Sequence, residues 1–154
     1  MVVAFGLVTV QSDELNQLFE MFEAYRKETE RFDPIPFEPG SPMEARQLML
    51  IGIEDEEWLW ITMDGERRGF VMSRVYYDDP LPEQQTTEIL ECYVTPDSRR
   101  LGLAKLAVEA ILARERERGT ALVEAGVLRD NAEALEFWEA LGFQVRALRT
   151  ARRP

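Results

Sequence analysis

The stretch from Val94 to Ala104 carries the residue types of an anion-binding site. It contains the pattern Arg99-x-x-Gly102-x-Ala104, between a segment that favours a strand and one with helical periodicity. A helix N-terminus presents unpaired N–H groups with partial positive charge, and a glycine followed by a small residue lets a phosphate approach them. Three cations add full charges to this loop: Arg99, Arg100 and Lys105. The same short pattern also fits an ordinary strand-to-helix turn with solvated arginines.

A second motif begins 27 residues after Ala104, at Asn131. The segment from Asn131 to Phe143 predicts a helix with Asn131 as its N-cap and Gly142 in the left-handed position after the last turn. Four residues form its apolar stripe: Ala134, Leu135, Trp138 and Leu141.

With both motifs in place, the chain resembles the GNAT superfamily of N-acetyltransferases, which bind acetyl-CoA. The superfamily's motif A is an arginine or glutamine, then x-x-Gly-x-Gly or Ala, after a strand that often ends in a Val-x-Pro step; Val94-Thr-Pro96 and the pattern from Arg99 to Ala104 match it. Its motif B is matched, with one departure, by Asn131, Ala134, Phe137, Trp138, Gly142 and Phe143. The two motifs cover residues 85–145, and the N-terminal half is assigned by consistency.

The resemblance implies one α/β (α+β) domain over residues 1–154, with a central mixed, mostly antiparallel sheet of about six to seven strands flanked by about four helices. It implies an enzyme that transfers an acetyl group from acetyl-CoA to a primary amine, directly and in a ternary complex, without a metal. The residues expected to bind acetyl-CoA are Cys92, Tyr93, Val94, Arg99, Arg100, Leu101, Gly102, Leu103, Ala104, Asn131 and Trp138.

The resemblance also implies that the strand around Leu90 to Val94 parts from the next strand and leaves backbone groups free for the pantetheine arm of acetyl-CoA. Backbone N–H groups near Cys92 to Val94 would then polarise the acetyl carbonyl, as an oxyanion hole does. The Cys92 thiol itself fits core packing better than a nucleophilic role, because the chain has no histidine to activate it.

Acetyl transfer is helped by a base, because an amine with a pKa of roughly 10.4 is almost entirely protonated at pH 7. Glu88 is the candidate, since it lies six residues before Val94, where a strand glutamate serves as base in the histone-acetylating branch of the superfamily. Glu91 is the competitor, because a β-bulge would exchange the strand faces. A water molecule as base, or a salt-bridged surface role for either carboxylate, is the further alternative.

The departure is Trp138, where many superfamily members carry a tyrosine that protonates the leaving thiolate. An indole N–H donates hydrogen bonds but does not give up its proton. A thiol with a pKa near 8.5 is a tolerable leaving group without an acid, and water or Tyr93 could substitute. Trp138 also leaves open a CoA-binding sensor without turnover, or an interaction module that has lost its ligand.

Composition narrows the remaining choices. The chain of 154 residues is 45% hydrophobic and has one cysteine and no histidine, which excludes an internal disulfide, the common zinc sites and a histidine base. Residues 1–98 hold 7 Lys+Arg against 21 Asp+Glu, a balance of −14, whereas residues 99–154 hold 11 against 8, a balance of +3. This distribution opposes nucleic-acid binding and suits an anionic co-substrate with a small cationic amine as acceptor, although acidic residues also serve solubility. A protein or peptide acceptor is the alternative.

The first residues are apolar but too short for a membrane span and lack the features of a secretory signal, so a cytoplasmic protein that does not enter membranes is expected. The open edges of the expected sheet permit a homodimer, which this superfamily often forms.

Six strands and four helices are expected to position these residues. The strands are 2–10, 57–63, 68–77, 86–94, 121–127 and 143–148, with a hairpin turn at Asp64-Gly65. The helices are 13–31 after an N-cap at Ser12, 41–52, 103–118 and 131–141. In helix 103–118 the expected buried face is Leu103, Leu106, Ala107, Ala110 and Ile111. In the superfamily the first two helices border the acceptor, so Tyr25, Phe32 and Phe37 are candidates for a pocket or for the core.

Overall fold

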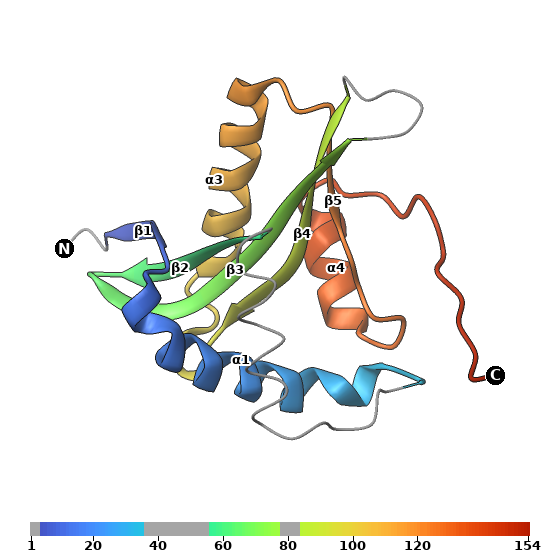
Figure 1. Cartoon of the computed structure of the whole chain (residues 1–154), viewed down its shortest axis with the longest axis horizontal. Coiled ribbons are helices and arrows are strands. Elements are labelled where there is room, and N and C mark those ends of the chain that lie inside the picture. Colours follow the sequence, from blue (N-terminus) through green and yellow to red (C-terminus); the bar gives the residue numbers. More distant parts are fainter. Residues whose placement is uncertain (1–3, 36–55, 78–83) are drawn as a thin grey trace.

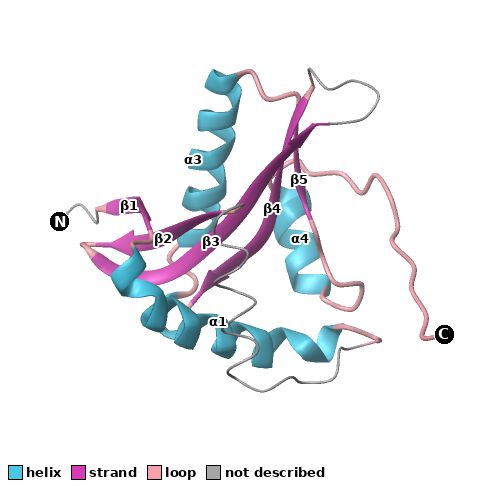
Figure 2. Ribbon diagram, viewed as in Figure 1, coloured by secondary structure: helices cyan, strands magenta, loops and turns pink. Residues whose placement is uncertain are grey.

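The computed structural model describes residues 4–35, 56–77 and 84–154. Within them, five strands form one sheet in the order β1-β2-β3-β4-β5 (Figures 1 and 2). The strands are β1 Phe5–Thr9, β2 Glu57–Met63, β3 Glu66–Tyr77, β4 Gln85–Val94 and β5 Leu122–Ala125. The first four run antiparallel to their neighbours, and β5 runs parallel to β4. The predicted mixed, mostly antiparallel sheet is therefore confirmed, with five strands in the described residues where six to seven were expected.

The hairpin between β2 and β3 forms where Asp64-Gly65 predicts it. Met63 pairs with Glu66, so the loop has two residues, and both adopt positive φ, 52° at Asp64 and 80° at Gly65. Two positive φ values give a turn whose twist matches that of antiparallel strands, and Asp-Gly accepts them with little strain.

In the described part of the chain, three α-helices flank the sheet: α1 Leu15–Thr29, α3 Leu103–Arg118 and α4 Ala132–Ala140. The predicted N-cap at Ser12 is wrong by one residue. A 3₁₀ turn over Ser12–Glu14 precedes α1, and the Gln11 N–H donates to the Glu14 carboxylate at 3.2 Å, so the chain turns one residue earlier. The predicted helix 41–52, like Phe37, lies outside the described residues. No helix of the described part is long and apolar enough to cross a membrane.

The ends of α3 and α4 follow the capping signals of the sequence. The Asn131 side chain accepts a hydrogen bond from the Ala134 N–H at 3.1 Å, which satisfies one unpaired donor of α4. Gly119 and Gly142 follow the last turns with φ of 74° and 90°, the left-handed conformation that glycine adopts without strain.

Replacing Asn131 by alanine is expected to lower the free energy of unfolding by about 1 kcal/mol, because the Ala134 N–H loses its acceptor. Urea denaturation followed by circular dichroism measures the change. Asn131→Asp is the control, since an aspartate retains the acceptor and should unfold near the wild-type midpoint. Equal losses in the two variants would contradict a capping role.

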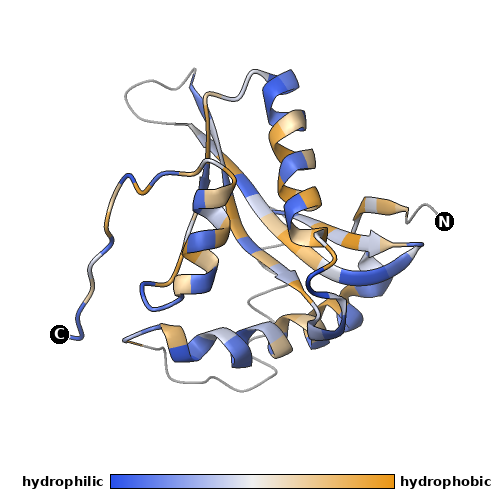
Figure 3. Ribbon diagram, turned by 180° about the vertical axis from the view of Figure 1, so that it is seen from behind, coloured by the Kyte–Doolittle hydropathy of each residue, from blue (hydrophilic) through white to orange (hydrophobic). Residues whose placement is uncertain are grey.

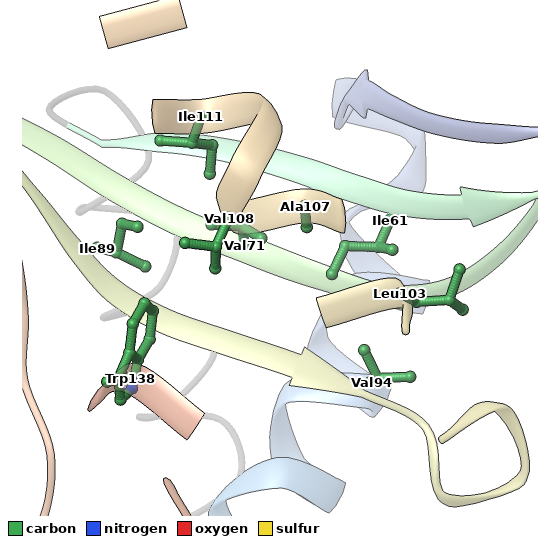
Figure 4. Close-up of a cluster of buried hydrophobic side chains, with 9 residues drawn as sticks. All are labelled: Ile61, Val71, Ile89, Val94, Leu103, Ala107, Val108, Ile111 and Trp138. Carbon is green, nitrogen blue, oxygen red and sulfur yellow. The ribbon is translucent and has the colours of Figure 1, made fainter. Parts of the chain in front are cut away.

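The two faces of the sheet carry separate cores. On one face α3 and α4 cover a cluster that includes Ile61, Val71, Ile89 and Trp138 (Figure 4). On the other face α1 covers Trp58, Trp60, Phe70, Met72 and Tyr93. Figure 3 views the molecule from the side of α3 and α4, with the sheet behind them.

One detail of the α3 packing differs from the predicted stripe. Leu106 is 42% exposed, whereas Val108 is fully buried against the sheet. The stripe that contacts the sheet is therefore rotated slightly about the helix axis from the predicted face.

The C-terminal part of α3 is tied to β4 by polar contacts. The buried Glu115 carboxylate accepts hydrogen bonds from the Thr87 hydroxyl at 3.0 Å and from the Thr120 hydroxyl at 2.5 Å. Arg114 and Arg118 each approach it at 3.1 Å, so its charge is paired. These bonds fix α3 along β4, whose end leads into the loop that opens α3.

The predicted final strand 143–148 is wrong: residues 143–154 form no strand in the structure. Side chains hold the start of this segment instead. Phe143 packs on Trp138 with ring centroids 4.9 Å apart, and Arg146 pairs with Glu124 of β5 at 2.8 Å. Val145 and Leu148 are exposed. The alternating pattern favours an extended chain, but a strand also requires a backbone ladder, which this segment does not make.

Candidate acyl-donor site

β4 and β5 part halfway along β4. Their parallel pairing joins Thr86–Ile89 to Leu122–Ala125, and β4 then continues to Val94 without β5 (Figure 2). On its other side β4 stays paired with β3 as far as Val94. Among the strands that the structure describes, none therefore pairs with one side of the last five residues of β4.

The backbone groups that face this opening can be assigned from the register. The Thr95 N–H donates to the Arg68 carbonyl at 2.8 Å, and Tyr93 pairs with Phe70. Because residues of an antiparallel strand alternate in the side to which their backbone groups point, Tyr93 bonds to β3, whereas Cys92 and Val94 point into the opening. Backbone groups of two predicted donor-binding residues thus line the gap between β4 and β5.

The side chains of this segment lie on opposite faces of the sheet. Cys92 packs against the α3 and α4 core, where burial, with a smaller contribution from Glu91, raises the pKa of its thiol to about 12. Such a thiol is unreactive at neutral pH. Tyr93 lies on the α1 face, where the Arg99 guanidinium is 5.5 Å from the centre of its ring.

The loop between β4 and α3 leaves the start of α3 open. Gly102 is the N-cap with φ of 76°, no side chain caps the helix, and the Leu106 N–H is bonded to the Gly102 carbonyl. The N–H groups of residues 103–105 precede that first helical bond and have no intrahelical acceptor. A Cβ built on Gly102 meets nothing within 4 Å, so there is open space above this helix start. The residues present therefore fit a phosphate group.

The three cationic residues at this loop, Arg99, Arg100 and Lys105, differ in their contacts. Arg99 donates to the Val94 carbonyl at 2.9 Å, and two of its nitrogens contact the Glu28 carboxylate of α1 at 2.7 and 2.8 Å. Arg99 therefore braces the loop against β4 and α1. Arg100 is exposed with φ of 64°, and Lys105 lies 3.9 Å from Glu109. Leu101, another predicted donor contact, has an exposed side chain.

Asn131 and Trp138 of the second motif both make contacts within the fold. Asn131 is the N-cap described above. Trp138 is 8% exposed and packs edge-on against Phe137 and Phe143, with ring centroids 5.1 and 4.9 Å away. Figure 4 shows its indole beside Ile89, which lies at the last paired position of β4. Trp138 therefore lies next to the point at which β4 and β5 part.

A β-bulge in β4 decides where the two candidate carboxylates lie. Met72 pairs with Glu91 and Ser73 with Ile89, so Leu90 is the extra residue of β4. Thr87 and Ile89 face α3, which places Glu88 on the α1 face, and the bulge brings Glu91 to the same face. The sequence left open a β-bulge that would exchange the strand faces, and the structure contains a β-bulge in β4.

The surroundings of these two carboxylates differ. One Glu88 oxygen accepts from Arg74 Nε at 2.9 Å and lies 2.8 Å from a second Arg74 nitrogen. Glu91 is partly buried and accepts a hydrogen bond from the Tyr25 hydroxyl of α1. Burial raises the pKa of Glu91 to about 7; the hydrogen bond from Tyr25 opposes this shift, and Glu56 adds to it. Sequence reasoning considered Tyr25 as a pocket or core residue and missed this contact, for which the sequence has no local signal.

A hollow of about 330 Å³ adjoins Glu88. It is lined by Arg74, Tyr76, Glu88, Glu124 and Arg149. Glu88 and Glu124 are paired neighbours on β4 and β5, and the Tyr76 hydroxyl donates to Glu124 at 2.5 Å. Across the described ranges, no three Asp, Glu, Cys or His side chains are grouped so as to hold a metal ion.

The gap between β4 and β5 and the uncapped start of α3 lie at the same end of the sheet (Figure 1). Residues 16–143 match the model of the acetyltransferase (GNAT) family, and the chain belongs to that family.

Individual relatives are distant. An uncharacterized N-acetyltransferase of Methanocaldococcus jannaschii is 24% identical over 145 residues, which are 94% of this chain and 62% of the relative. The chain thus spans less than two thirds of that protein. The structure of a ribosomal-protein-alanine N-acetyltransferase from Brucella melitensis biovar Abortus 2308 superimposes with a TM-score of 0.76 at 16% identity, over 97% of this chain and 99% of the other.

A second solved structure, an aminoglycoside N-acetyltransferase in complex with CoA, gives a TM-score of 0.72 at 14% identity, over 100% of this chain and 97% of the other. At these identities the superpositions establish the fold, and the predicted fold class is confirmed.

Proposed function

We propose that the protein transfers an acetyl group from acetyl-CoA directly to a primary amine of a small molecule. The observation that carries the proposal is the parting of β4 from β5 next to the uncapped start of α3. The first feature offers backbone groups to an extended arm, and the second offers N–H groups to phosphate.

The donor would be held mainly by backbone. N–H groups of residues 103–105, which have no intrahelical acceptor, would bind the pyrophosphate in the open space at Gly102. Acetyl-CoA supplies the activated acetyl group as a thioester. Backbone groups of Cys92 and Val94 would pair with its pantetheine arm, and an N–H of this segment would polarise the carbonyl, an effect worth a few kcal/mol per donor. In this assignment Asn131 and Trp138 support the site from α4, by capping and by packing.

Glu91 is the base in this proposal, in place of Glu88. A base works best when its pKa lies near the operating pH, and burial brings the pKa of Glu91 to about 7. Glu88 is engaged by Arg74 and lines the hollow, so we assign it to acceptor binding. Glu91 accepts the proton that the ammonium group must lose before its nitrogen attacks.

The acceptor class rests on this chain's own charges. Three carboxylates lie on the sheet face that α1 covers or at its edge: Glu88, Glu91 and Glu124. Residues 1–98 also carry a net charge of −14. A cationic amine is attracted to such a face. Related structures include enzymes named for aminoglycosides and for a ribosomal protein, so the fold itself serves both small and protein acceptors.

Titration calorimetry with acetyl-CoA, followed by a screen of small amines and lysine peptides for CoA release, tests the proposal. We expect binding with a dissociation constant in the micromolar range and turnover of a small amine. Acetylation of peptides alone would overturn the acceptor class, and no binding of acetyl-CoA would overturn the proposal as a whole.

Trp138 favours a second candidate, a CoA-binding sensor. It occupies the position of the tyrosine acid of many relatives, and its indole is buried against Phe137 and Phe143. Binding of acetyl-CoA without turnover across the amine panel would favour the sensor.

A further inference from the structure

We propose that Tyr25 of α1 is a positioning residue that holds the Glu91 carboxylate in one orientation at the bulge of β4. The inference rests on the proposed function, since it assigns Tyr25 a part in preparing the base of that reaction. Nothing in the two sequence motifs points to α1.

The Tyr25 ring is fixed where its hydroxyl meets Glu91. Its centroid lies 5.9 Å from that of Phe22 on α1, 5.9 Å from Phe70 on β3 and 5.5 Å from Tyr93 on β4. The contact with Phe70 is edge-to-face, with an interplanar angle of 88°. Because rotation of the ring would break all three contacts, the hydroxyl is presented to Glu91 in one direction.

The helix that carries Tyr25 is anchored beside it. Glu28 lies one turn further along α1 and holds Arg99 through two contacts of 2.7 and 2.8 Å. Arg99 in turn donates to the Val94 carbonyl. One face of α1 therefore contacts β4 at the bulge, through Tyr25, and at the start of the anion-binding loop, through Glu28.

The charges around Glu91 give the Tyr25 hydroxyl a measurable effect. Two titratable groups from other elements act on Glu91: Tyr25 of α1 and Glu56, which precedes β2. Its neighbour on β4 is the neutral Cys92 thiol, and the residue opposite it on β3 is the uncharged Met72. Burial and Glu56 favour the protonated carboxyl, and the Tyr25 hydrogen bond favours the carboxylate. Burial, with Glu91, raises the pKa of Tyr25 well above its usual range, so Tyr25 stays a donor.

The test is Tyr25→Phe, which removes the hydroxyl and keeps the ring. The acidic limb of kcat/KM, which reports the free enzyme, should move to higher pH. A hydrogen bond to a charged group is strong enough that kcat/KM at pH 6.5 should fall about tenfold. Activity should recover towards wild type by pH 9, and the affinity for acetyl-CoA should not change. Superimposable profiles, or a loss of equal size at every pH, would overturn the inference.

Two further measurements separate positioning from a general effect on folding and from failure of the proposed function. In a Glu91→Gln background, Tyr25→Phe should have no further effect, and a full additional loss would contradict action through Glu91. Carboxyl ¹³C NMR of the wild type, with Glu91→Gln to assign the signal, gives the Glu91 midpoint without turnover. The midpoint of the Glu91 titration should rise in Tyr25→Phe. An unchanged midpoint overturns the inference even if the enzyme is active. A raised midpoint in a protein that shows no turnover overturns the proposed function alone.

Discussion

Replacing Glu91 by glutamine is expected to lower kcat/KM for amine acetylation by roughly 10²- to 10⁴-fold near pH 8, the usual contribution of a positioned base. Glutamine keeps the size of the side chain and an oxygen that can accept from the Tyr25 hydroxyl, so the fold should be retained. The wild-type kcat/KM should rise as pH passes through about 7, because the carboxylate is the active form. This rise of kcat/KM near pH 7, the acidic limb of the profile, should disappear in Glu91→Gln. Stopped assays of CoA release from pH 5.5 to 9.5 measure both profiles.

Glu88→Gln is the matched control, because Glu88 lies on the same face of β4 and its carboxylate contacts Arg74. We expect a higher KM for the amine with the acidic limb retained. Loss of that limb in Glu88→Gln, with retention in Glu91→Gln, would instead identify Glu88 as the base, as the sequence alone predicts.

Local signals in the sequence were sufficient for most elements. The β2–β3 turn follows from Asp64-Gly65, whose positive φ values require those residue types. The ends of α3 and α4 follow from Gly119, Asn131 and Gly142 for similar reasons. The open start of α3 follows from Gly102, because a glycine N-cap has no side chain to satisfy the first N–H groups.

The arrangement of the candidate base could not be predicted in the same way. Leu90 is extra in β4 because of how β4 pairs with β3, and that pairing is not written in the residues around Leu90. The Tyr25–Glu91 hydrogen bond joins residues 66 positions apart. The strand predicted for residues 143–148 fails for a related reason, since its alternating pattern gives a conformation but no partner.

The contacts of Arg99 with β4 and α1 could not be predicted from local sequence signals either. The sequence predicts that Arg99 adds its charge to a candidate anion-binding loop, whereas the structure pairs Arg99 with Glu28 of α1. The pair leaves the backbone N–H groups, the exposed Arg100 and Lys105 as the local sources of positive potential. Donor binding should therefore depend more on the shape of the helix start than on the charge of Arg99.

Replacing Gly102 by glutamate is expected to weaken acetyl-CoA binding by at least about 100-fold, and calorimetry measures the loss. The side chain would enter the open space above the helix start, and its charge would repel phosphate. The φ of 76° also makes any L side chain at Gly102 strained, by roughly 1–2 kcal/mol.

Gly119→Glu separates these effects, because Gly119 ends the same helix with φ of 74° and equally open surroundings. Both variants should lose stability in thermal denaturation, but Gly119→Glu should bind acetyl-CoA as the wild type does. Equal losses of affinity would attribute the effect to α3 as a whole. Unchanged binding in Gly102→Glu would place the donor elsewhere and remove the observation on which the proposed function rests.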